Sequence, residues 1–146
     1  MQKIYLDNQA TTPLDPKVLS AMNPWFLEKF GNASSKNHIY GWEAEEAIEI
    51  ARESISRLIG SLPKEIIFTS GATESNNIAL QGIANNYINK KKHIITLKTE
   101  HKAVLDICQH LEKKEFDITY LPVDKDGLIR LSEFENSIQS NTILVS

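Results

Sequence analysis

Residues 66–78, with the sequence IIFTSGATESNNI, form the stretch on which the fold of this chain depends. The apolar run at residues 66–68 predicts a short buried strand. Small residues follow at positions 70–73, and apolar residues then recur at the spacing of a helix. The helical set consists of Ile78, Ala79, Ile83, Ala84 and Tyr87. The stretch therefore predicts a strand, a tight turn and a helix in succession.

The turn at residues 70–73 predicts an anion site. The first N–H groups of a helix have no partner within the helix, and the helix dipole adds about half a positive charge there. A phosphate monoester, with a charge of about −1.5 to −2 at neutral pH, suits that position. We therefore expect Gly71, Ala72 and Thr73 to hold a phosphate. The alternative is an ordinary turn in which Ser70 or Thr73 caps its own helix.

The composition is that of a globular protein of about one domain. The chain has 146 residues, of which 41% are hydrophobic and 24% charged. A net charge of −3 gives no reason to expect nucleic acid or an anionic membrane as partner. The one cysteine, Cys108, allows no internal disulfide and fits a reducing, cytoplasmic setting. No apolar run approaches the ~20 residues of a membrane span, and no metal site is predicted.

Helix and strand patterns alternate along the rest of the chain. Asp15 and Pro16 are typical of a helix start, and we expect that helix to stop at Gly31. A second helix is expected at residues 40–59, where Gly60 ends it. Strands are expected at residues 94–97, 117–121 and 142–145, with helices from about residue 102 and from Ser132, which forms a capping box with Glu135.

This alternation predicts an α/β fold of mostly parallel strands, joined by right-handed crossovers, with helices on both faces. Ligands of such sheets bind beyond the carboxyl ends of the strands. The turns at residues 70–73 and 99–101 both occupy such a place. If their strands are neighbours, His101 faces the same crevice as the phosphate turn. The final apolar run lacks a following turn, so we expect this sequence to be the front part of a longer chain.

Three motifs resemble those of the cysteine desulfurases of iron–sulfur cluster assembly. They are YLDNQATTP at residues 5–13, FTSGATESNN at residues 68–77 and TEHKAVLD at residues 99–106. The resemblance spans essentially the whole chain and places it in the class-V pyridoxal-phosphate aminotransferase superfamily. It implies an incomplete three-layer sheet of the fold-type I large domain. Residues 15–146 would form the N-terminal part of that cofactor-binding domain, and residues 1–14 a segment that packs with the small domain.

The resemblance also implies an activity. The family uses pyridoxal 5'-phosphate to remove sulfur from L-cysteine, giving L-alanine and an enzyme-bound persulfide. The sulfur goes to an iron–sulfur scaffold or to tRNA-modifying partners, and the family forms homodimers. Its Gly-Ala-Thr turn, here Gly71, Ala72 and Thr73, binds the cofactor phosphate. Its Thr-Glu-His histidine, here His101, stacks on the pyridine ring and assists proton transfers. His38 lies in a loop near the subunit interface, where a surface histidine is an equally good interpretation.

Other parts of the family's machinery are missing from the sequence. The Ser-Gly-His-Lys motif with the Schiff-base lysine does not occur, and neither does the aspartate that pairs with the pyridine nitrogen. Cys108 lies on the apolar face of a helix and is predicted to be a small buried hydrophobe, not the nucleophile. We therefore expect the 146 residues alone to be inactive and, with an open strand edge, prone to aggregate. Two alternatives stay open: a related class-V lyase or aminotransferase, and a truncated, non-catalytic paralogue.

Overall fold

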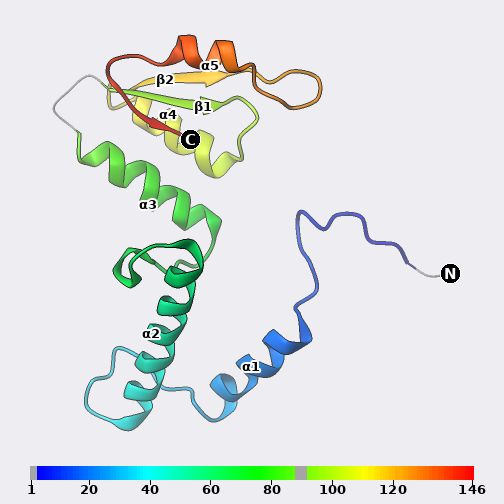
Figure 1. Ribbon diagram of the computed structural model, residues 1–146, viewed down its shortest axis with the longest axis vertical. Coiled ribbons are helices and arrows are strands. Elements are labelled where there is room, and N and C mark those ends of the chain that lie inside the picture. Colours follow the sequence, from blue (N-terminus) through cyan, green and yellow to red (C-terminus); the bar gives the residue numbers. More distant parts are fainter. Residues whose placement is uncertain (1–2, 88–91) are drawn as a thin grey trace. The chain divides into compact units, whose positions relative to one another are not determined.

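A computed structural model describes residues 3–87 and 92–146 of the chain (Figure 1). The chain forms two compact units, Met1–Ile67 and Phe68–Ser146. The expected division after residue 14 concerns the longer family fold and stays a prediction.

The first unit contains the two helices that their capping residues predict. Helix α1, Pro16–Leu27, begins where the Asp15 carboxylate accepts the Lys17 N–H at 2.7 Å. It ends at Leu27, before the expected Gly31, where the Pro24 carbonyl accepts the N–H groups of both Glu28 and Lys29. Helix α2, Ile39–Ile59, ends at Gly60, whose φ of 73° is the left-handed conformation that glycine adopts without strain. A short 3-10 helix, η1 (Pro63–Glu65), follows.

Two glycines allow the loop between α1 and α2 to pack closely on the start of α2. A Cβ atom on Gly41 would lie 1.9 Å from the Ser35 carbonyl oxygen, and one on Gly31 would lie 2.0 Å from the Tyr40 carbonyl oxygen. Real side chains do not approach that closely, so both positions require glycine.

Residues 66–68 do not form the predicted strand. Their backbone is extended at Ile66, whose carbonyl accepts a hydrogen bond from the Arg52 guanidinium. Ile67 is 65% exposed and Phe68 is 49% exposed. A strand needs the hydrogen bonds of a neighbouring strand. In the described part of the chain, the sheet consists of three other strands, and none of them pairs with residues 66–68. The prediction of a buried strand at residues 66–68 was therefore wrong.

The second unit is built on a parallel sheet with the strand order β2-β1-β3. Its elements are α3 (Ala72–Asn85), β1 (His93–Leu97), α4 (Lys102–Glu112), β2 (Asp117–Leu121), α5 (Leu131–Ser137) and β3 (Thr142–Val145). The central strand β1 pairs in register with β2, from His93 opposite Asp117 to Leu97 opposite Leu121. Since β2 and β3 flank β1 on opposite sides, right-handed crossovers put α4 and α5 on opposite faces, as Figure 1 shows. The predicted α/β fold with parallel strands is confirmed.

The core of the second unit lies between the sheet and the helices α3 and α4. It consists of Leu80, Ala84, Ile94, Val104, Ile107, Cys108 and Leu111. Burial of these side chains explains why α3 and α4 pack on each other and on one face of β1. The packing fixes the start of each helix relative to the sheet, and both starts carry candidate site residues.

Helix α5 begins earlier than the predicted capping box. Its N-cap is Arg130 and not Ser132. The Arg130 carbonyl accepts the N–H groups of Glu133 and Phe134 at 3.0 and 3.1 Å, so the first helical turn has already formed when the chain reaches Ser132. The predicted pairing of Ser132 with Glu135 was therefore wrong.

Candidate cofactor site

The predicted phosphate turn is the start of helix α3. Gly71 is the N-cap residue, with an extended backbone, and Ala72 and Thr73 are the first two helical residues. All three are exposed. The first helical hydrogen bond runs from the Ser75 N–H to the Gly71 carbonyl at 3.1 Å. The N–H groups that precede it point out of the helix start, as in any α-helix.

Within the described chain, no side chain caps the start of α3. The Ser70 hydroxyl, which could have done so, donates instead to the Glu74 carboxylate at 2.8 Å. The alternative in which Ser70 or Thr73 caps its own helix is therefore wrong. The N–H groups of Ala72 and Thr73 have no acceptor among the described residues. Two open N–H groups at the positive end of a helix, beside a glycine without a side chain, fit the phosphate of pyridoxal phosphate.

Glu74 holds Ser70, the residue before the N-cap of α3. Its Oε2 atom accepts the Ser70 backbone N–H at 2.6 Å as well as the Ser70 hydroxyl. The backbone bond, and then the hydroxyl bond, lower the pKa of Glu74. The sequence reasoning missed this residue. A carboxylate in the first turn of a helix is a known partner of the residues before it, and that signal was present in the motif.

A pair of hydroxyl groups braces the other side of the same turn. The Thr69 and Ser75 hydroxyl oxygens lie 2.7 Å apart, and each lies 3.3 Å from the Gly71 carbonyl oxygen. The backbone before α3 is thus held by side chains of its own motif, although no strand holds it.

His101 is the N-cap of helix α4, directly beyond β1, and is exposed. Its Nδ1 atom accepts the Ala103 N–H at 3.1 Å. An accepting Nδ1 carries no proton, so the proton of the neutral ring lies on Nε2. The predicted place of His101, after a parallel strand and at a helix start, is confirmed.

The starts of α3 and α4 lie at the same end of a helix pair. Figure 1 shows the two helices running in the same direction. Between them lies a groove of about 330 Å³. The first-turn residues Thr73 and Ala103 line it, as do Gln81 and His110 further along each helix. Of the candidate site residues, Thr73 lines this groove, whereas His101, Gly71 and Ala72 do not. A crevice shared by His101 and the phosphate turn stays a prediction.

The pattern of these motifs is shared with known proteins. The sequence profile of the aminotransferase class-V family matches residues 4–146. The chain belongs to the class-V aminotransferase family.

Among curated members of this class-V family, the chain is similar to cysteine desulfurases. It is 59% identical to the cysteine desulfurase IscS of Rickettsia felis over 143 residues, which cover 98% of this chain and 35% of that protein. It is 57% identical to the cysteine desulfurase of Pongo abelii over 146 residues, all of this chain and 32% of that protein. The chain spans about a third of the length of these relatives. The resemblance inferred from the three motifs is confirmed.

Solved structures of similar proteins have the same fold. A NifS-like protein superimposes with a TM-score of 0.91 at 42% identity, over 99% of this chain and 39% of that one. SspA in complex with cysteine superimposes with a TM-score of 0.84 at 44% identity, over 93% of this chain and 39% of that one. The class-V chain therefore has the α/β fold of this group.

The cysteine of this class-V chain is not placed for chemistry. Cys108 lies in the core between α4 and the sheet and is 0% exposed. Burial, and to a smaller extent the charges of Glu112 and Glu100, raise the pKa of the thiol to about 11. At neutral pH the thiol is protonated and out of reach of solvent, so its predicted role as a buried hydrophobe is confirmed.

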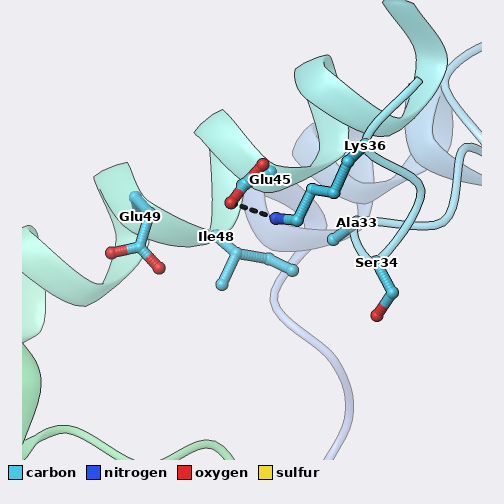
Figure 2. Close-up of a pocket in the computed structure, with 6 residues that line it drawn as sticks. All are labelled: Ala33, Ser34, Lys36, Glu45, Ile48 and Glu49. Atoms are coloured by element: carbon cyan, nitrogen blue, oxygen red, sulfur yellow. Dashed lines mark hydrogen bonds and ion pairs between the residues drawn. The ribbon is translucent and has the colours of Figure 1, made fainter. Parts of the chain in front are cut away.

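The loop before α2 forms a separate cavity in the first unit, of about 270 Å³ (Figure 2). The Lys36 ammonium, the one cationic group that lines it, forms an ion pair with Glu45. Glu49 adds a second carboxylate. This cavity therefore offers no net positive charge to an anion. His38 in the same loop caps α2, because its Nδ1 accepts the Gly41 N–H at 3.2 Å; its role at a subunit interface stays a prediction.

The described residues contain no cluster of histidine, cysteine, aspartate or glutamate side chains that could hold a metal ion. None of the helices in residues 3–87 and 92–146 has the length and apolar character needed to cross a membrane.

Proposed function

We propose that this chain is the N-terminal part of the cofactor-binding domain of a pyridoxal-phosphate-dependent cysteine desulfurase. The full-length enzyme removes sulfur from L-cysteine and gives L-alanine and an enzyme persulfide, as a cytoplasmic homodimer. The persulfide sulfur serves iron–sulfur cluster assembly and tRNA thiolation through acceptor proteins. The observation that carries the proposal is the uncapped start of α3, with the open N–H groups of Ala72 and Thr73.

The similarity to known proteins supports this choice of substrate. The curated relatives are cysteine desulfurases, and one similar solved structure holds cysteine. Pyridoxal phosphate supplies an electron sink for bonds at the Cα atom of an amino acid. The contribution of the present residues is to bind and orient the cofactor and to assist proton transfer.

Gly71, Ala72 and Thr73 would hold the cofactor phosphate. The N–H groups of Ala72 and Thr73 donate to phosphate oxygens, and the dipole of α3 favours the dianion at that end. The space beside Gly71 is open, because nothing lies within 4 Å of the place where a Cβ atom would be.

His101 would stack on the ring and donate from Nε2. Its Nδ1 atom is engaged with the Ala103 N–H, so the ring can take a second proton only by giving up this helix cap. The proposed role in proton transfer therefore requires release of this cap, so that Nδ1 can accept a proton; with the cap in place, the neutral ring offers the cofactor a hydrogen bond from Nε2–H.

The groups that form covalent bonds in the family lie outside these 146 residues in our proposal. The sequence contains no Ser-Gly-His-Lys motif, and its one thiol, Cys108, is buried. We therefore expect no formation of alanine from cysteine by this chain alone. A fusion of residues 1–146 to the remaining part of the Rickettsia felis enzyme should restore alanine and persulfide formation. A fusion that acts on another amino acid would favour the related lyase or aminotransferase, and an inactive but folded fusion would favour the non-catalytic paralogue.

The binding part of the proposal is tested by removing one N–H donor. Ala72→Pro deletes the N–H at the first helical position, where proline is tolerated in a helix. Loss of one hydrogen bond to a charged group should weaken pyridoxal phosphate binding about tenfold or more. Binding of pyridoxal, which lacks the phosphate, should not change.

A matched control makes the same change at another helix of the second unit. Leu131→Pro also introduces proline at a first helical position, in α5, and should leave the affinity for both ligands unchanged. Equal affinities of the unaltered chain and Ala72→Pro for pyridoxal phosphate would contradict the assignment of the phosphate to this turn.

A further inference from the structure

We propose that Glu74 is a positioning residue of the phosphate turn: its carboxylate holds Ser70 and keeps the N–H groups of Ala72 and Thr73 open to the cofactor phosphate. This inference rests on the proposed function, because it concerns how the same turn binds. Glu74 itself does not touch the phosphate in this account.

The geometry of Glu74 gives the reason. It is the third residue of α3, and its Oε2 atom accepts both the N–H of Ser70 at 2.6 Å and the Ser70 hydroxyl at 2.8 Å. Ser70 directly precedes the N-cap Gly71. Two hydrogen bonds to one residue fix the direction from which the chain enters the helix, and hence where the first free N–H groups point.

The direction of the Glu74 carboxylate is unusual for a helix start. In a capping box, the carboxylate of the third helical residue bonds to the N–H of the N-cap residue. Here the acceptor reaches one residue further back, to Ser70. Consequently the N–H groups of Gly71, Ala72 and Thr73 are all without an acceptor among the described residues. The backbone at the start of α3 is therefore fixed, while no described side chain accepts a hydrogen bond from its open N–H groups.

The helix dipole favours a carboxylate in the first turn of α3 as long as no ligand is bound. A phosphate bound at the same helix end would be repelled by that carboxylate. Glu74 is exposed and adds nothing to the core. The Ser70 bonds also lower the pKa of Glu74, so it remains an acceptor at neutral pH. For phosphate binding, the favourable effect of Glu74 is that it fixes the position of Ser70 and of the N–H groups that follow it.

Two substitutions separate the hydrogen-bonding role of Glu74 from the effect of its charge. Glu74→Ala removes the acceptor, and Glu74→Gln keeps an acceptor oxygen while removing the charge. If Glu74 positions the turn, Glu74→Ala should weaken binding of pyridoxal phosphate about tenfold, the effect of roughly one hydrogen bond, and Glu74→Gln should restore most of that affinity. If the carboxylate only repels the phosphate, both variants should bind more tightly than the unaltered chain.

The measurements use the fusion of residues 1–146 to the remaining part of the Rickettsia felis enzyme, and they do not depend on activity. Dissociation constants for pyridoxal phosphate and pyridoxal are compared by fluorescence titration, and the hydrogen exchange of the Ser70 amide is followed by NMR. The matched control is Glu133→Ala, which removes the first-turn carboxylate of α5. It should change neither dissociation constant, whereas Glu74→Ala should also speed Ser70 exchange.

The outcomes distinguish this inference from the proposed function. Equal affinity of the unaltered chain for pyridoxal phosphate and pyridoxal would contradict the phosphate site and overturn the role of Glu74 with it. Phosphate-dependent binding that Glu74→Ala leaves unchanged or strengthens would overturn the role of Glu74 alone. Failure of Glu74→Gln to recover affinity would overturn it as well.

Discussion

Replacement of His93 should show how the sheet of the second unit is held together. His93 lies in the central strand β1 and is 0% exposed. Its Nδ1 atom is 2.8 Å from the Thr142 hydroxyl of β3, and its Nε2 atom is 2.8 Å from the Thr119 hydroxyl of β2. One buried imidazole thus links both flanking strands to the centre, at the end of β1 opposite to His101.

The expected magnitude follows from these contacts. His93→Leu fills most of the volume but removes two hydrogen bonds, each with a net contribution of about 1 kcal/mol. The Thr142 hydroxyl keeps the N–H of Gln139 at 2.8 Å, whereas Thr119 is left without a partner in the described chain. Leaving one partly buried hydroxyl unsatisfied adds about 1–3 kcal/mol, so the free energy of unfolding should fall by about 3–5 kcal/mol.

A double-mutant cycle tests this reasoning by urea unfolding followed with far-ultraviolet circular dichroism. Thr119→Val removes the orphaned hydroxyl, so the double variant His93→Leu with Thr119→Val should be more stable than the two single losses together predict. We expect an interaction energy of about 1–3 kcal/mol. Additivity of the two losses within about 0.5 kcal/mol would refute the bridge between β1 and β2.

Three further predictions follow from other contacts. Gly41→Ala should destabilise the first unit by about 3 kcal/mol or more, because its Cβ would lie 1.9 Å from the Ser35 carbonyl oxygen; the control Gly82→Ala, in open space within α3, should be neutral or stabilising in the same urea titration. Burial raises the pKa of Cys108 to about 11, so the thiol ionises at lower pH in the unfolded chain than in the folded one. The free energy of unfolding should therefore fall between about pH 9 and 11, and Cys108→Ala should not show this part of the fall. An equal fall in both proteins would contradict the burial of the thiol. Nitrogen-15 NMR should find the proton of neutral His101 on Nε2, and a majority of the Nδ1–H tautomer would rule out its helix cap.

Much of the fold could be predicted because its signals are local. Asp15 caps α1 and Gly60 ends α2, as the sequence indicated, since each acts on neighbours a few residues away. The three strands of the sheet are short, largely apolar runs, and the central strand β1 pairs with both of the others. Their parallel pairing followed from the helices between them.

The errors arose where structure depends on more distant partners or on competing starts. Residues 66–68 have the composition of a strand but no neighbouring strand in the described chain. Ser132 has the right neighbour for a capping box, yet the Arg130 carbonyl accepts the first helical N–H groups before it. Local pattern could not decide between these competing helix starts.

The places of the candidate site residues at two helix starts could be predicted, whereas the contacts that support the fold around them could not. The glycine turn and His101 were recognised from their motifs, because the residues that present open donors and an imidazole are adjacent in sequence. His93 was not recognised, because its partners Thr119 and Thr142 lie 26 and 49 residues away. Glu74 lies within the motif, but sequence spacing does not show that its carboxylate accepts the N–H of Ser70 and not that of Gly71.

The most direct test of the account is a crystal structure of the complete protein with pyridoxal phosphate bound. The account predicts that the phosphate oxygens lie within hydrogen-bonding distance of the backbone N–H groups of Ala72 and Thr73. A phosphate bound at any other part of the molecule, with the start of α3 open to solvent, would contradict it.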